Sequence, residues 1–208
     1  MNAPVAVVRE IQAPIHARKS SIRETRALDP MPIVQVNLAP GLNLDFRSLR
    51  CYVELFRVPD EPTQSNTEFT YYAEHGSALG RDNFPVFALY RTRHPQQSNM
   101  GTVLHRIGNH LFYEQSHETH LLKGIAIAEP VTGVHNVQFV FPGLGVLQSG
   151  KYVLRYNVHD IVTGRHLASC FGAPFQVMSA SNFPGMGSTT PLTNSLAPLH
   201  IPGVRRRN

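Results

Sequence analysis

Residues 137–158 have the sequence VQFVFPGLGVLQSGKYVLRYNV, and this stretch decides the fold class. An aromatic and aliphatic run, Val137–Phe141, leads through a Pro-Gly segment and a glycine turn into a second run, Tyr152–Val158. In the second run, large apolar residues occupy every other position, which is typical of a strand with one buried face. The stretch therefore predicts two antiparallel strands joined as a β-meander.

The rest of the chain shows the same pattern, with short apolar runs between glycines and prolines. Several short strands at this spacing predict an antiparallel β-sandwich. The further strand-like runs are Val5–Ile11, Leu28–Val36, Cys51–Val58, Phe84–Tyr90, Leu121–Ala128 and Pro174–Met178. Phe84–Tyr90 could instead be an irregular buried segment. Helix is scarce: we expect a turn or two within Arg106–Glu114, and a short helix with Thr190 as N-cap and Pro191 at its first position.

Length and composition favour a soluble, intracellular protein that has either one domain with extensions or one domain with a small subdomain. The chain has 208 residues, enough for a sizeable core, and a net charge of +5. Two cysteines, Cys51 and Cys170, are too few for a secreted scaffold held by disulfides, although the two could pair. The apolar stretch at the N-terminus is too short for a secretion signal, and no run reaches the length of a membrane span.

The positive charge concentrates in residues 16–26, here called the basic loop, which lies between the first two strand-like runs. Cations on a rigid scaffold can contact a phosphate backbone, and arginine can also donate two hydrogen bonds to guanine. Ser20, Ser21 and Thr25 add neutral donors for phosphate oxygens. We expect Arg23 and Arg26 to contact base edges. The residues predicted to bind DNA are Arg18, Lys19, Ser20, Arg23 and Arg26.

Other interpretations of these residues stay open. The basic loop could be an ordinary solvated loop, since most charge runs only keep a protein soluble. A histidine-rich stretch could bind zinc or copper, although no cysteine lies near it. Its members are His94, His105, His110, His117 and His120. The chain lacks a nucleophile elbow, and the Gly143-Leu144-Gly145 segment precedes a β-turn rather than the helix a dinucleotide site needs. We therefore expect no enzymatic activity, no cofactor and no metal.

Three motifs in order resemble the velvet domain of fungal regulators. The first is Leu28–Val34, similar to an Asp-Pro-Pro-Pro-Ile-Val motif, with Met31 in place of the middle proline. The second is the Phe139–Tyr156 strand pair already described. The third is Ala173–Thr193, in which a Pro-Phe-x-Val strand is followed by a Phe-Pro-Gly turn and a Thr-Pro-Leu helix start. The resemblance covers residues 5–203, predicted as one velvet-like domain, and leaves 204–208 as a basic tail.

This resemblance implies an immunoglobulin-like sandwich similar to the Rel-homology domain. It implies a nuclear regulator, able to shuttle with the cytoplasm, that links development, sporulation and secondary metabolism. The expected partners are double-stranded DNA and other velvet-family proteins, in homodimers or heterodimers, and no membrane. The family's DNA-contacting loop follows the first strand, which is the basic loop here. Two alternatives remain: an adaptor that dimerises but binds DNA weakly, and a β-sandwich that binds a ligand or metal through its histidines.

Overall fold

The computed structural model describes residues 6–39, 44–58, 116–132 and 136–204, together with the backbone of four short strands between them. Those four strands form two antiparallel pairs. They are β5 (Thr70–Tyr72) with β6 (Leu89–Arg91), and β7 (Val103–Ile107) with β8 (His110–Tyr113).

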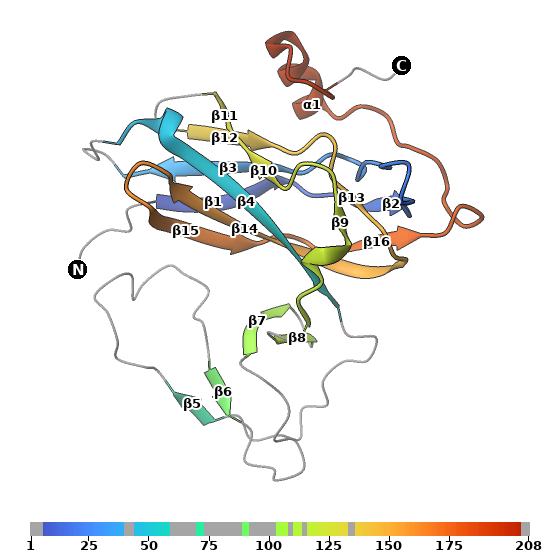
Figure 1. The fold of residues 1–208 in the computed structure, drawn as a ribbon, viewed down its shortest axis with the longest axis horizontal. Coiled ribbons are helices and arrows are strands. Elements are labelled where there is room, and N and C mark those ends of the chain that lie inside the picture. The colour runs from blue at the N-terminus through green and yellow to red at the C-terminus, as the bar shows by residue number, and fades with distance from the viewer. Residues whose placement is uncertain are drawn as a thin grey trace.

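Two sheets make up the body of the domain (Figure 1). The four-stranded sheet has the order β1 (Ala6–Gln12), β3 (Ile33–Leu38), β12 (Asn136–Val140), β11 (Pro130–Thr132). The six-stranded sheet has the order β10 (Ile127–Ala128), β4 (Leu49–Arg57), β14 (Gly150–Asp160), β16 (Phe175–Met178), β2 (His16–Arg18), with β15 (Arg165–Phe171) also paired to β14. The predicted mostly-β sandwich is confirmed.

Smaller elements complete the described fold. Strand β9 (Leu122–Lys123) pairs with β13 (Gly145–Val146) beside the sandwich. The helical elements are η1 (Phe46–Ser48), η4 (Thr119–Leu121), α1 (Pro191–Leu196) and η5 (Ala197–Leu199). None of the helices in the described part of the chain is long and apolar enough to span a bilayer.

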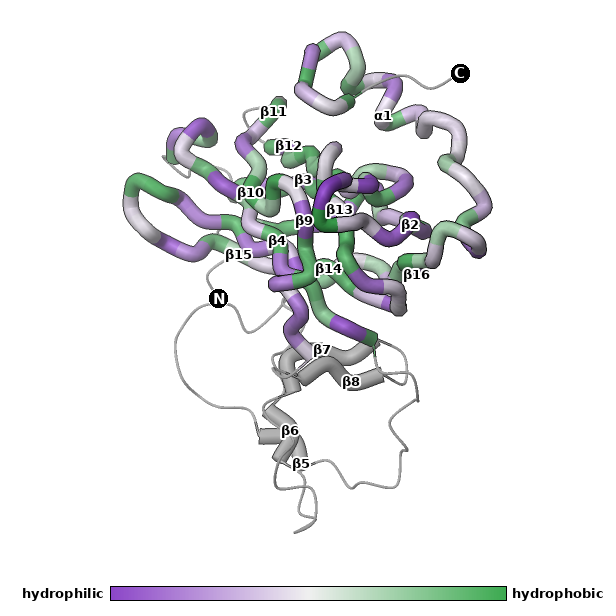
Figure 2. Tube along the Cα trace, turned by 45° about the vertical axis from the view of Figure 1, so that its right-hand side comes forward, coloured by the Kyte–Doolittle hydropathy of each residue, from purple (hydrophilic) through white to green (hydrophobic). Residues whose placement is uncertain are grey.

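The core lies between the two sheets and follows from the alternation in their strands. In β14, Tyr152, Leu154, Tyr156 and Val158 are fully buried, as the period-two pattern predicts. They join one cluster with inward residues of β1, β3, β4 and β12. Figure 2 shows hydrophobic residues along much of β12 and β14. Burial of this apolar face holds the two sheets together.

The structure corrects the predicted meander. β12 pairs with β3 in one sheet, whereas β14 pairs with β4, β15 and β16 in the other. The Pro142–Ser149 link therefore crosses between sheets instead of forming a hairpin. Both sheets present an apolar face, so either pairing would bury the same residues, and the strand pattern alone does not distinguish them.

Two other local predictions were also wrong. Near Arg106–Glu114, where a turn or two of helix is expected, the described residues belong instead to the end of β7 and to β8. Leu121–Ala128, expected as one strand, is divided between η4, β9 and β10, because Gly124 has a φ of 99° and turns the chain. Within the otherwise antiparallel sandwich, the short strand β2 pairs in parallel with β16. Most of the predicted strand Phe84–Tyr90 lies outside the described residues.

A half-buried carboxylate joins the two sheets. Glu10 of β1 accepts a 2.6 Å hydrogen bond from the Tyr156 hydroxyl of β14 and another of 2.6 Å from the Ala173 backbone N–H. Burial raises the pKa of Glu10 above its ordinary value of 4.5, although both hydrogen bonds favour the charged form. The folded protein therefore holds the Glu10 proton more tightly than the unfolded chain does.

This raised pKa predicts a pH-dependent difference between wild type and a Glu10→Gln variant. As pH rises from about 4.5, the unfolded state releases the Glu10 proton before the folded state does. The free energy of unfolding of wild type minus that of E10Q should therefore fall towards neutral pH. Urea unfolding of both proteins between pH 4.5 and 7.5 measures this difference, and a constant or rising value would contradict the assignment.

The segment after β16 returns to the first strands through a polar cluster. Thr190 caps α1, since its hydroxyl accepts a 3.1 Å hydrogen bond from the Thr193 N–H, as the sequence predicts. The Thr190 hydroxyl also donates to Gln12 Oε1 of β1. Gln12 Nε2 in turn donates to the Met31 carbonyl at 2.8 Å and to Thr193 Oγ1 at 3.1 Å. These bonds fix α1 against the edge of the sandwich.

Replacing Thr190 with alanine should destabilise the domain by about 2 kcal/mol, because it removes a helix cap and leaves a buried glutamine oxygen without its donor. Ser195→Ala is the matched control, since its exposed hydroxyl bonds only to the Leu192 carbonyl within the same helix. Its effect should stay within about 0.5 kcal/mol. Chemical denaturation compares the two variants, and equal losses would argue against the cluster.

Candidate nucleic-acid interface

The basic loop begins as a strand rather than as free chain. Residues 16–18 form β2 and pair with β16, and the Lys19 N–H donates a 2.8 Å bond to the Met178 carbonyl. The loop then leaves the six-stranded sheet and lies against β13, where the Ser20 N–H donates to the Val146 carbonyl at 2.8 Å. It returns where the Leu28 N–H donates to Leu144 at 2.8 Å. Both ends of the loop are thus bonded to the sandwich.

The tip of the loop is a closed turn. The Ser21 N–H donates to the Glu24 carbonyl at 3.0 Å, and the Glu24 N–H donates to Ser21 Oγ at 3.1 Å. From β9, Lys123 Nζ donates to the Ser21 carbonyl at 2.6 Å and to the Ile22 carbonyl at 2.5 Å. The turn is therefore fixed by a residue about 100 positions later in the chain, which the sequence analysis did not identify.

Ser20 has a different place from the one expected of a DNA contact. Its side chain is buried, and its hydroxyl accepts a 2.9 Å bond from the Arg26 N–H while lying 3.3 Å from the Arg26 carbonyl. The hydroxyl therefore connects the two limbs of the loop. Gly145 lies directly beneath, where a Cβ atom would come within 2.5 Å of Ser20 Oγ and 2.6 Å of the Arg26 carbonyl oxygen.

The four cations of the loop differ in their exposure. Lys19 and Arg23 are exposed, Arg18 is partly exposed, and all three lack an ion pair among the described residues. Arg26 pairs with Glu24, and its side chain is 31% exposed. Lys19 and Arg23 are consequently the cations best placed to meet an anionic partner.

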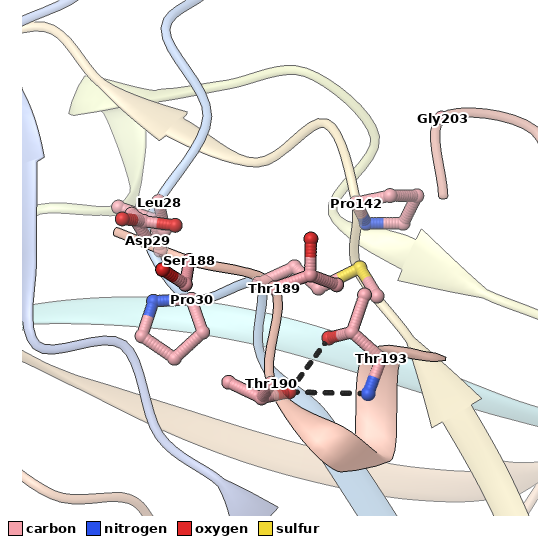
Figure 3. Close-up of a pocket in the computed structure, with 10 residues that line it drawn as sticks. Leu28, Asp29, Pro30, Pro142, Ser188, Thr189, Thr190, Thr193 and Gly203 are labelled. Atoms are coloured by element: carbon pink, nitrogen blue, oxygen red, sulfur yellow. Dashed lines mark hydrogen bonds between the residues drawn. The ribbon is translucent and has the colours of Figure 1, made fainter. Parts of the chain in front are cut away.

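A pocket of about 200 Å³ lies where the first and third motifs meet (Figure 3). Asp29 lines it, and the Asp29 carboxylate accepts a 2.5 Å hydrogen bond from the Gly187 N–H. The same carboxylate oxygen, Oδ2, lies 3.8 Å from His16 Nε2, and the His16 ring packs edge-on against Phe183. These contacts hold the base of the basic loop against the Phe-Pro-Gly turn. Thr190 and Thr193, joined by dashed lines in Figure 3, belong to the α1 cap.

In the histidine-rich stretch, the two histidines whose side chains are described do not converge on a metal site. His117 Nε2 lies 3.7 Å from Glu54, whereas His120 Nε2 lies 3.4 Å from Glu118. Among the described residues no group of three or more histidine, cysteine or acidic side chains could hold an ion. His94 lies outside the described residues, and no side-chain placement is described for His105 or His110.

Both cysteines are free thiols. Cys51 is fully buried, and burial raises its pKa well above the ordinary value. Burial also raises the pKa of Cys170 to about 12. Both thiols therefore stay protonated at neutral pH, a poor state for a nucleophile.

These features define a class: an immunoglobulin-like β-sandwich that presents a fixed cationic loop at one end, held by motifs distant in sequence. The family model described as Velvet factor matches residues 7–207. The chain belongs to the velvet family. Near the end of the matched stretch, Val204 packs against the small cluster around Ile33 and Leu196.

Curated fungal relatives agree with this membership. A "probable velvet family sexual development regulator" of Laccaria bicolor is 29% identical, over 92% of this chain and 67% of that protein. A protein of the same description from Schizophyllum commune is 30% identical, over 92% of this chain and 69% of its own length. The spore development regulator umv1 of Mycosarcoma maydis is 35% identical over 32% of this chain and 8% of its own.

The close packing of the basic loop against Gly145 can be tested by substituting this glycine. Gly145→Ala should displace residues 20–26 and destabilise the domain by about 1–3 kcal/mol, because the new Cβ would overlap backbone and a buried hydroxyl. Gly143→Ala is the matched control, since a Cβ there meets nothing within 4 Å. Thermal unfolding and limited proteolysis of the loop would compare the two, and a G145A protein as stable as G143A would contradict this packing.

Proposed function

We propose that this protein is a nuclear DNA-binding regulator of fungal development that contacts the phosphate backbone through its basic loop. It acts as a homodimer or as a heterodimer with another velvet protein. The names of the relatives, which are sexual and spore development regulators, support the developmental role. Control of sporulation and of secondary metabolism is part of the same proposal.

The observation that carries the proposal is the pair of exposed cations on a fixed turn. Lys19 and Arg23 lie within five residues of each other in a loop that is hydrogen-bonded at both ends and at its tip. A loop that is already ordered loses little conformational freedom on binding. Each phosphate neutralised would release condensed counterions from the duplex, which drives association.

A second candidate is favoured by two other contacts. Arg26 is engaged by Glu24, and Ser20 is buried inside the loop, so two of the five predicted DNA contacts already have partners within the molecule. A single copy would then bind DNA weakly, as expected of an adaptor that dimerises with a stronger DNA-binding partner. Both candidate functions share the same fold and differ in the affinity of the isolated chain for DNA.

The salt dependence of DNA binding distinguishes them. A Lys19→Ala/Arg23→Ala variant should bind a labelled duplex more weakly than wild type, and the slope of log affinity against log salt should fall by about 2, since each lost phosphate contact removes about 0.9. Fluorescence anisotropy at several salt concentrations measures the slope.

The matched control is Arg47→Ala/Arg165→Ala, which removes the same charge from exposed positions. Arg47 belongs to η1 and Arg165 begins β15, and these elements lie at the end of the sandwich opposite β2 (Figure 1). The control should keep the wild-type slope. Equal slopes for all three proteins would refute the loop as the DNA contact, and negligible binding by wild type alone would favour the adaptor.

A further inference from the structure

Ile22 stands at the tip of the basic loop with 91% of its surface exposed. No other large apolar side chain in the described ranges is as exposed; Val162 follows with 80%. The side chain contributes almost nothing to the core, and a tight turn would ordinarily carry a polar residue or glycine there. Fold stability therefore does not explain an isoleucine at this position.

The backbone around Ile22 is held rigidly. Lys123 binds the carbonyls of Ser21 and Ile22, and the Ser21–Glu24 hydrogen bonds close the turn around it. The isoleucine is thus presented outward from a fixed position, directly before the exposed Arg23. The exposed Ile22 side chain can be removed from water favourably only if it packs against an apolar group of a binding partner.

We propose that Ile22 contacts the C5-methyl group of a thymine in the major groove when the basic loop binds double-stranded DNA. This inference rests on the proposed function. The thymine methyl is the apolar group that base pairs present in that groove, and apolar side chains contact it. The isoleucine side chain cannot hydrogen-bond to phosphate oxygens. The neighbouring Arg23, in the same loop, can bind either phosphate or guanine. Ile22 is accordingly a specificity residue, and the cations supply affinity.

Replacing thymine with deoxyuridine removes that one methyl group from the DNA and tests the contact directly. Duplexes selected by wild type from a randomised pool are resynthesised with deoxyuridine at one thymine at a time. Wild type should lose about three- to fivefold in affinity at one position, the effect of one buried methyl group. Ile22→Ala should bind the thymine duplex several-fold more weakly and should not distinguish thymine from uracil there.

Two controls accompany the measurement. Val162→Ala truncates another exposed β-branched residue, in the turn between β14 and β15, and should discriminate as wild type does. Ile22→Val keeps a branched apolar side chain and should retain most of the discrimination. Since Ile22 is almost fully exposed, these variants should keep the wild-type melting temperature.

The possible results separate this inference from the proposed function. If wild type binds, K19A/R23A binds weakly and I22A still distinguishes thymine from uracil, the methyl contact is refuted while DNA binding stands. An equal loss by I22A on both duplexes, or no uracil-sensitive position, also refutes it. If the selection yields no duplex that wild type binds, the proposed function fails and this inference fails with it.

Discussion

The close approach of the basic loop to Gly145 is the constraint on which the candidate site depends. At that point the Arg26 carbonyl oxygen and the buried Ser20 hydroxyl occupy the space that any other residue at 145 would need for its Cβ. The contact lets the loop bond to β13 on one side while β2 bonds to β16 on the other. The conformational entropy of the loop is therefore lost when the protein folds rather than when it meets a partner.

Because the basic loop is held against the sandwich, its charged side chains project from a fixed backbone. The opposite charges of Arg26 and Glu24 largely cancel, so this ion pair adds little to the positive potential of the loop. An ion pair that water reaches also contributes little to stability, so it strengthens the loop only slightly. Lys123 behaves differently, because its ammonium group binds neutral carbonyls and its charge stays uncompensated by them. A residue of β9 thus both fixes the turn and adds a fifth cation to the surface around it.

Local signals in the sequence predicted the local features well. The alternation in Tyr152–Val158 gave the buried face of β14, and Thr190 with Pro191 gave the start of α1. The assignment of β12 and β14 to separate sheets could not be predicted, because a link of that length can close a hairpin or cross a sandwich. The roles of Lys123 and Gly145 also depend on neighbours remote in the chain, so no window of sequence contained them.

The motifs that carry the family resemblance meet at the base of the loop, although they are far apart in sequence. Leu28 bonds to Leu144 of the second motif, and Asp29 accepts from Gly187 of the third. These positions are bonded or buried on several sides, so packing restricts which residues can occupy them. Ile22 and Arg23 have no such restriction, because solvent surrounds them. Family membership therefore supports the scaffold and the placement of the loop, whereas any choice of partner that is particular to this chain would rest on the exposed side chains.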